Sequence, residues 1–105
     1  MLQIEYNNDR LEKVCTNAYE ATKKYGPKMA GKIQQRISEI SAAPSVETLL
    51  QFRIRRCHAL DANRKGQYAM DLVHPYRLVF KKKGDDVQIV KILEIVDSVS
   101  YTHLR

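Results

Sequence analysis

Residues 67–83 read QYAMDLVHPYRLVFKKK, and this stretch decides the fold that the sequence predicts. Apolar side chains occupy every second position in its two halves, first at 68, 70 and 72 and then at 76, 78 and 80. A period of two is typical of a strand with one buried face. Only Val73, His74 and Pro75 separate the two runs, and so short a connection joins antiparallel neighbours. We therefore predict a β-hairpin here.

Further elements surround this hairpin in the sequence. Residues 87–96 are apolar on both faces, which is typical of a strand in the middle of a sheet. Residues 2–6 alternate as a short first strand, and residues 11–25 have the apolar spacing of one helix, with capping side chains at 7–9. A second helix begins at Pro27 and ends near residue 43, so that the two form a helical hairpin with a very short joint. Ser45 then caps a short helical turn.

This order of elements predicts an α+β fold, in which an N-terminal helical hairpin packs on a small twisted antiparallel β-sheet. A chain of 105 residues supports one domain. No apolar run approaches the roughly 20 residues of a membrane span, and the N-terminus lacks a signal pattern, so we expect a cytoplasmic protein with no membrane partner. Cys15 and Cys57 are too few for a disulfide framework and are predicted to be reduced and structural.

The positive charge is concentrated in one part of the chain. Nine basic and two acidic residues give residues 53–83 a charge of +7, whereas the whole chain carries +6. The basic residues are Arg53, Arg55, Arg56, Arg64, Lys65, Arg77, Lys81, Lys82 and Lys83. We expect them to gather on the side of the sheet that the helices leave open, as in a surface that contacts phosphates. A solvated basic face would carry the same charge.

The candidate chemistry of this span is proton transfer and anion binding. The histidines and cysteines lack the paired spacings of zinc ligands, so neither a metal nor another cofactor is expected. His58 lies among arginines, which favour the neutral imidazole that a general base needs; alternatively, it is a histidine at a strand end, hydrogen-bonded to the backbone. Arg77 points to the face opposite Tyr76 and is suited to bind two phosphate oxygens; alternatively, it pairs across the hairpin with Asp71.

Residues 57–70, CHALDANRKGQYAM, followed by YRLVF at 76–80, resemble the plasmid-maintenance killer proteins, the HigB branch of the RelE/ParE toxins. Those sequences typically read His-Pro-Leu, a loop rich in Lys, Gly and Asp, Arg-x-Gly-x-Trp-Ser, and then Trp-Arg-Ile-x-Phe. The strand and helix order also fits, so the resemblance covers a RelE-like domain over residues 1–97. Ala59 replaces the usual proline, residues 61–63 lack the loop's frequent lysine, and Tyr68 and Tyr76 stand where tryptophan is common.

The resemblance implies a toxin of a type II toxin-antitoxin pair that cuts mRNA on the ribosome without a metal. It implies a helix-turn-helix, HigA-like antitoxin as partner, and through it an indirect contact with operator DNA. The implied catalytic residues are His58, Arg77, Asp97, Tyr101 and His103, and the implied RNA-binding residues are Arg55, Arg56, Arg64, Lys65 and Lys81. A ParE-like poison of DNA gyrase and a catalytically silent domain that binds antitoxin or nucleic acid are the alternatives.

The C-terminal tail, residues 98–105, allows two interpretations. Residues 99–105 look like translated sequencing adapter, and in that case they are a scar and the true end is missing. If the tail is native, Tyr101 and His103 could reach back to the site as an acid and a stacking residue. The match at Asp97 does not depend on this choice.

Overall fold

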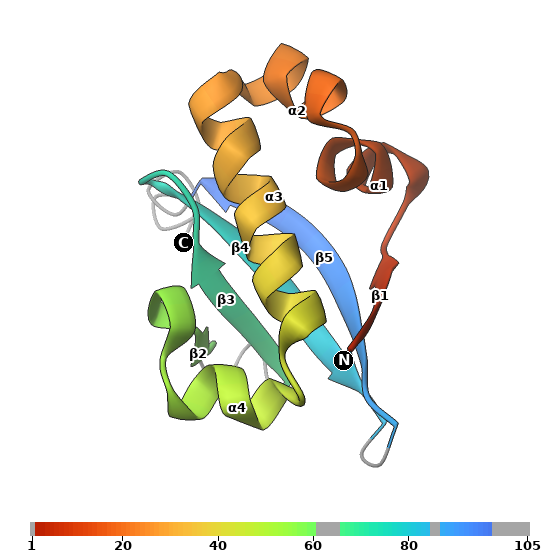
Figure 1. The fold of residues 1–105 in the computed structure, drawn as a ribbon, viewed down its shortest axis with the longest axis vertical. Coiled ribbons are helices and arrows are strands. Elements are labelled where there is room, and N and C mark those ends of the chain that lie inside the picture. The colour runs from red at the N-terminus through yellow and green to blue at the C-terminus, as the bar shows by residue number, and fades with distance from the viewer. Residues whose placement is uncertain (1, 61–65, 85–86, 98–105) are drawn as a thin grey trace.

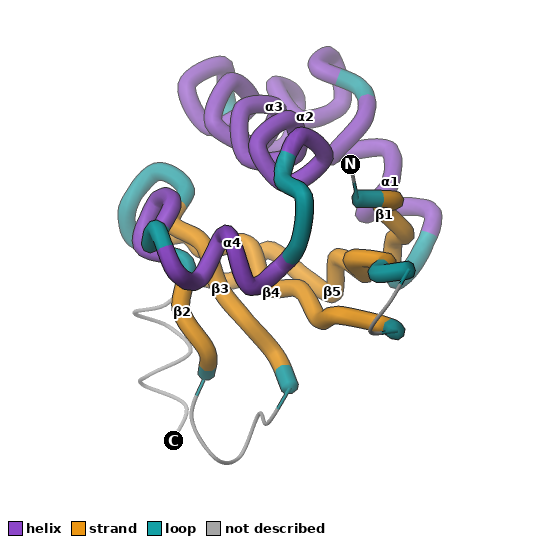
Figure 2. The backbone as a smooth tube through the Cα atoms, turned by 60° about the horizontal axis from the view of Figure 1, so that its bottom comes forward, coloured by secondary structure: helices purple, strands orange, loops and turns teal. Residues whose placement is uncertain are grey.

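A five-stranded sheet with the order β1-β5-β4-β3-β2 forms one layer of the molecule, as the computed structural model shows for residues 2–60, 66–84 and 87–97. Helices α1, α2 and α3 form a second layer on one face of the sheet (Figures 1 and 2). The elements are β1 (Gln3–Tyr6), α1 (Asp9–Thr16), α2 (Ala18–Tyr25), α3 (Pro27–Ala42), α4 (Val46–Gln51), the 3-10 turn η1 (Ile54–Arg56), β2 (His58–Ala59), β3 (Gln67–Asp71), β4 (Tyr76–Lys83) and β5 (Ile89–Asp97).

The predicted hairpin is present, because β3 and β4 pair antiparallel with Met70 opposite Leu78. The expectation of an interior strand is also confirmed, since β5 lies between β1 and β4. The sheet is not wholly antiparallel, however: β1 runs parallel to β5, with Ile4 opposite Val90. Parallel neighbours need a long crossover connection. Here the chain passes through the helical layer before it returns to the sheet, and this passage makes the parallel pairing possible.

The single helix predicted over residues 11–25 is in fact two helices, α1 and α2, which meet at Asn17. The Asn17 backbone is extended, and its side-chain Oδ1 accepts hydrogen bonds from the backbone N–H groups of Tyr19 at 3.0 Å and Glu20 at 3.4 Å. Asparagine side chains compete in this way with the helical backbone bonds. Asn17 therefore ends α1 and caps α2 while the apolar spacing continues across the break.

The core lies between α3 and the strands. Ile33 and Ile40 of α3 are fully buried, as are Leu78 and Phe80 of β4 and Ile92 of β5. Burial of each such side chain contributes about 1.5–3 kcal/mol to folding. None of the described helices lies on the opposite face of the sheet (Figure 2).

Both cysteines are buried and unpaired, as predicted. Burial raises the pKa of the Cys15 thiol to about 12 and that of Cys57 to about 11. The thiolates are therefore scarce at neutral pH, and both side chains serve as packing groups. No helix within the described ranges has both the length and the apolar character needed to cross a membrane.

Candidate functional site

The pleat of β3 and β4 sorts the candidate residues between the two faces of the sheet. Met70 and Leu78 are buried beneath the helices. Asp71 follows Met70 in β3 and Arg77 precedes Leu78 in β4, so both point to the outer face, the face of the sheet away from the helices. His58 of β2 lies opposite Ala69 and shares that face. At strand spacings of about 4.8 Å and a rise of about 3.4 Å per residue, the Cα atoms of His58 and Arg77 are about 12 Å apart. Side chains of these lengths can contact the same nucleotide.

A backbone hydrogen bond sets the orientation of the His58 ring. Its Nδ1 lies 2.7 Å from the carbonyl oxygen of Arg56. A carbonyl oxygen only accepts, so Nδ1 carries the hydrogen and the lone pair of the neutral ring is on Nε2. The alternative interpretation of His58, a histidine at a strand end that is hydrogen-bonded to the backbone, predicts this bond. The same bond leaves Nε2 as the basic atom, which a general base requires.

Two arginines share the carboxylate of Asp71 on the outer face. The Arg56 Nε atom lies 3.5 Å from Oδ2, and the Arg77 Nε atom lies 3.7 Å from Oδ1. The predicted pairing of Arg77 with Asp71 is thus present. A hollow of about 170 Å³ is lined by Arg56, Asp71, Arg77, His74 and Tyr76 among others. From the sequence, His74 was weighed only as a metal ligand. It lines this hollow because it lies in the turn between β3 and β4.

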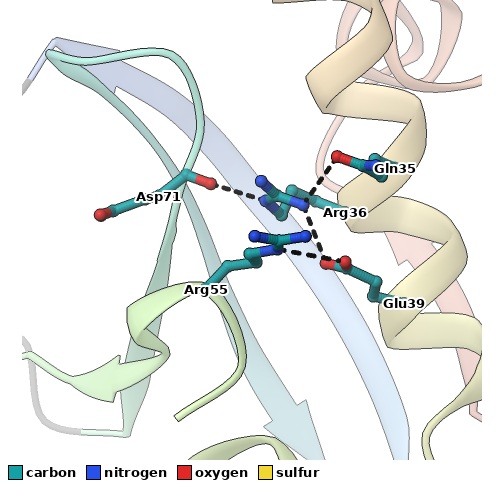
Figure 3. A network of polar contacts seen from close by, with 5 residues as sticks. All are labelled: Gln35, Arg36, Glu39, Arg55 and Asp71. Carbon is teal, nitrogen blue, oxygen red and sulfur yellow. Dashed lines mark hydrogen bonds and ion pairs between the residues drawn. The ribbon is translucent and has the colours of Figure 1, made fainter.

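Arg36 and Glu39 of α3 connect this helix to Asp71 and Arg55 (Figure 3). The Arg36 side chain is buried, and its Nε donates to the Asp71 carbonyl oxygen at 2.8 Å. One terminal nitrogen donates to Oε1 of Glu39 at 3.0 Å, while Oε2 of Glu39 accepts from Arg55 Nε at 3.4 Å. A buried charge is stable only when it is paired and hydrogen-bonded, and these contacts satisfy that condition. They also tie Arg55 to α3.

Sequence reasoning missed Arg36, although a signal for it was present. Met29, Ile33 and Ile40 recur at helical spacing in this helix and form its apolar stripe. Position 36 lies three residues after Ile33 and four before Ile40, so it belongs to the same helical face. A charged residue on the core face of a helix indicates a buried partner, and that partner is found in Asp71 and Glu39.

The three consecutive lysines do not form one surface, which corrects the expectation that the basic residues gather on the open side. Lys81 is on the outer face, in register with Gln67. Lys82 points to the other face, where its Nζ lies 2.8 Å from Oε2 of Glu47 in α4. Lys83 pairs with Glu5 of β1 at 3.0 Å. The alternation of side chains along β4 places Lys82 on the face opposite Lys81 and Lys83.

Asp97 is next to the β5 partner of Arg77, but its register position is on the other face of the sheet. It lies opposite Tyr76 in the register of β4 and β5. The Tyr76 ring packs edge-on against Tyr25 of α2 with 5.7 Å between centroids, so this pair of positions faces the helices. The other predicted site residues, Arg64, Lys65, Tyr101 and His103, lie outside the described residues, as does the tail from 98 onward.

No group of three histidine, cysteine, aspartate or glutamate side chains that could hold a metal ion occurs among the residues that the structure describes. The chemistry that this face can support with the described side chains is proton transfer at His58 and anion binding at Arg56 and Arg77. Both arginines are partly exposed, so an anion can approach them from solvent.

Comparisons with known proteins find the fold and not a sequence relative. No family model matches the chain, and no curated protein sequence matches it. A YoeB/ParE toxin from Agrobacterium tumefaciens superposes with a TM-score of 0.64 at 14% identity, over 90% of this chain and 95% of that one. A chain of the YoeB-YefM complex from Staphylococcus aureus superposes with a TM-score of 0.59 at 24% identity, over 90% and 94%. These likenesses confirm the predicted RelE/ParE-like α+β fold.

Proposed function

We propose that this chain is the toxin of a type II toxin-antitoxin pair and that it cleaves mRNA on the ribosome without a metal ion. The observation that carries the proposal is the outer face of the sheet, where Nε2 of His58 is free of the backbone bond and two arginines lie nearby. The fold of the YoeB/ParE toxins supports the toxin assignment. The membership of the HigB branch rests on the sequence resemblance.

The proposed reaction is attack of a ribose 2′-hydroxyl on the adjacent phosphate. Nε2 of His58 takes the proton of the hydroxyl, the 2′ oxygen forms a bond to phosphorus, and the bond from phosphorus to the 5′ oxygen breaks. The products are a 2′,3′-cyclic phosphate and a 5′-hydroxyl. Arg77 stabilises the extra negative charge on the phosphate oxygens in the transition state. Loss of such a donor slows a reaction by about 10²–10³-fold.

The 5′ oxygen must receive a proton as it leaves. For a native C-terminal tail we assign this step to residues 98–105, with Tyr101 and His103 as the acid and the stacking residue. Asp97 is left out of the proposed reaction because it shares the register position of Tyr76, on the helical side. A ribosome that holds the message in line supplies orientation that a site with so few groups lacks, an effect of several orders of magnitude.

The proposed partners follow from the same assignment. The complex of YoeB with YefM in the second structural neighbour supports an antitoxin partner for this chain, and the resemblance to HigB makes that partner a HigA-like, helix-turn-helix protein. The remaining RNA contacts are assigned to Arg56, Lys81, Arg64 and Lys65. Arg55 joins these contacts, because its pairing with Glu39 uses only Nε, at 3.4 Å, and its side chain is half exposed.

The test is induced expression in a bacterial host, with growth arrest and ribosome-bound transcript cleavage scored together. His58→Gln keeps an N–H that can donate to the Arg56 carbonyl but removes the base, and it is expected to slow cleavage by about 10²–10⁴-fold. Arg77→Ala is expected to slow it by about 10²–10³-fold. Arg10→Ala, a matched loss of charge on exposed α1, should leave cleavage unchanged.

The second candidate is a ParE-like poison of DNA gyrase, which the Agrobacterium tumefaciens neighbour favours through its description as a YoeB/ParE toxin. Such a protein needs no acid or base. Intact transcripts, failed DNA supercoiling and growth arrest that survives both the His58 and the Arg77 substitutions would establish this second function in place of the first.

A further inference from the structure

We propose that Arg56 and Arg77 form a two-arginine clamp for a phosphate group, and that the Asp71 carboxylate occupies this clamp as an internal competitor until a phosphate displaces it. The inference deepens the proposed function, because it names the group that the site binds and how access to it is controlled. It starts from the position of one carboxylate between two guanidinium groups.

The contacts of Asp71 are loose compared with the other ion pairs of the sheet. Arg56 and Arg77 approach it at 3.5 and 3.7 Å, each through a single Nε atom. The lysine pairs at Lys82 and Lys83 close to 2.8 and 3.0 Å. Long ion pairs between partly exposed groups add little to stability. An incoming anion therefore displaces the Asp71 carboxylate at little loss of folding stability.

Charge and space at this position match a phosphate. Two guanidiniums against one carboxylate leave one positive charge uncompensated, and a phosphodiester carries one negative charge with two free oxygens. A guanidinium binds two such oxygens through parallel N–H donors, which a single Nε contact does not use. The hollow beside the arginines measures about 170 Å³, well above the roughly 10–15 Å³ that one water needs by the same measure.

The backbone of Asp71 is held in place, so that the exchange requires only its side chain to turn. Arg36, buried in α3, donates from Nε to the Asp71 carbonyl oxygen at 2.8 Å. The Asp71 side chain is one-third exposed, and that of Arg56 is 80% exposed. A side-chain rotation at such a position is rapid compared with loop motion. The clamp can therefore change occupant without a change of fold.

The experiment measures binding of inorganic phosphate to the purified full chain by NMR, through the Nε–H resonances of its arginines. Asp71→Asn removes the competing charge and keeps the size of the side chain. We expect phosphate to bind this variant at least about threefold more tightly, the gain expected when a weak exposed ion pair no longer competes. The shifted resonances should be those of Arg56 and Arg77.

Glu5→Gln is the matched control, because it removes an acid from an ion pair on the same sheet, with Lys83. It should leave phosphate affinity unchanged, and an equal gain in this variant would overturn the proposal by showing a general effect of charge. In an Arg77→Ala background, Asp71→Asn should bring no gain. Arg56→Ala changes a mostly exposed side chain and should weaken phosphate binding in the otherwise native chain.

Weaker phosphate binding by Asp71→Asn would also overturn the proposal, because Asp71 would then be orienting the arginines for the anion. The same holds if phosphate shifts neither arginine resonance in that variant. None of these readouts requires RNA cleavage. If the chain shows the expected phosphate response but does not cleave transcripts, the proposed nuclease function is wrong and the phosphate clamp stands. If it cleaves transcripts but shows no phosphate response, the clamp is wrong and the nuclease function stands.

Discussion

Three arginines in the loop before β2 have left-handed backbone conformations that side chains with a Cβ atom rarely adopt. The φ angles are 48° at Arg53, 49° at Arg55 and 58° at Arg56. Each such residue costs about 1–2 kcal/mol relative to the right-handed region. Arg55 also pairs with Glu39, and Arg56 pairs with Asp71. This loop carries the carbonyl that orients His58, so the strain is located at the proposed site.

Arg53 allows the strain to be measured apart from function. Within the described residues it takes part in backbone hydrogen bonds and in no ion pair. Glycine adopts positive φ without the Cβ penalty, so Arg53→Gly should be more stable than Arg53→Ala by about 1 kcal/mol. Urea unfolding of the two variants checks this. An alanine variant as stable as the glycine variant would show that the loop relaxes when the arginine is removed.

At the scale of elements, α4 is joined to the far end of the sheet by one small polar cluster. Glu47 in the first turn of α4 accepts hydrogen bonds from Lys82 Nζ at 2.8 Å and from Gln88 Nε2 at 2.9 Å. The side-chain oxygen of Gln88 in turn accepts from the backbone N–H of Val46 at 2.9 Å. The first turn of a six-residue helix is thereby held to β4 and to the residue before β5.

These bonds predict a dependence of stability on pH. The hydrogen bond from Lys82 and then that from Gln88 lower the pKa of Glu47 from 4.5 to about 2. The folded-state pKa is below the unfolded value, so the stabilisation is fully present above pH 4.5 and is lost as the pH falls through about 2. Glu47→Gln should therefore be less stable than the native chain at pH 7, and the difference should shrink toward zero at pH 2.

Thermal unfolding of both proteins across this range is the measurement, with Glu12→Gln on α1 as the control for loss of an exposed acid. A difference between Glu47→Gln and the native chain that stayed constant from pH 7 to pH 2 would show that the carboxylate charge has no part in holding α4.

Over the whole molecule, folding divides the basic span among different surfaces. Lys82 and Lys83 are each paired with a glutamate, and Arg55 is tied to Glu39. Of the described residues in the span, Arg77, Lys81 and Lys83 alternate onto the outer face, and Lys83 is paired there with Glu5. Arg56 lines the hollow beside Arg77. The surface proposed to meet RNA is therefore smaller than the charge of +7 on residues 53–83 suggests.

This division predicts how RNA binding responds to salt. Each phosphate contact with single-stranded RNA changes the slope of log affinity against log salt by about −0.7. Lys81→Ala should flatten the slope by about that amount, and Lys82→Ala should leave it nearly unchanged because Lys82 points to the helical side. Fluorescence anisotropy with a 2′-O-methyl RNA, which cannot be cleaved by 2′ attack, measures both. Equal changes of the salt slope in the two variants would contradict the placement of Lys81 and Lys82 on opposite faces of the sheet.

Local patterns in the sequence were sufficient for the elements whose form depends on near neighbours. The alternation around Leu78 predicts the central hairpin, the spacing around Ile33 predicts α3, and the apolar faces of residues 87–96 predict an interior strand. These periods reflect burial of one face of a strand or helix, which is set by residues two, three or four positions apart. The N–H groups that donate to the Asn17 side chain are equally local, but an asparagine within a continuing apolar stripe does not by itself reveal a break.

The tertiary structure alone decided which distant residues meet. Nothing in residues 2–6 specifies a parallel partner in β5, and the side of the sheet on which Asp97 lies depends on its register with Tyr76. The sequence singled out His58 and Arg77, but only the pairing of β2 with β3 and of β3 with β4 places both on one face beside Asp71. Long-range register arises from packing of the complete core and not from any local period, and for that reason the chemistry of this face became visible only in the folded chain.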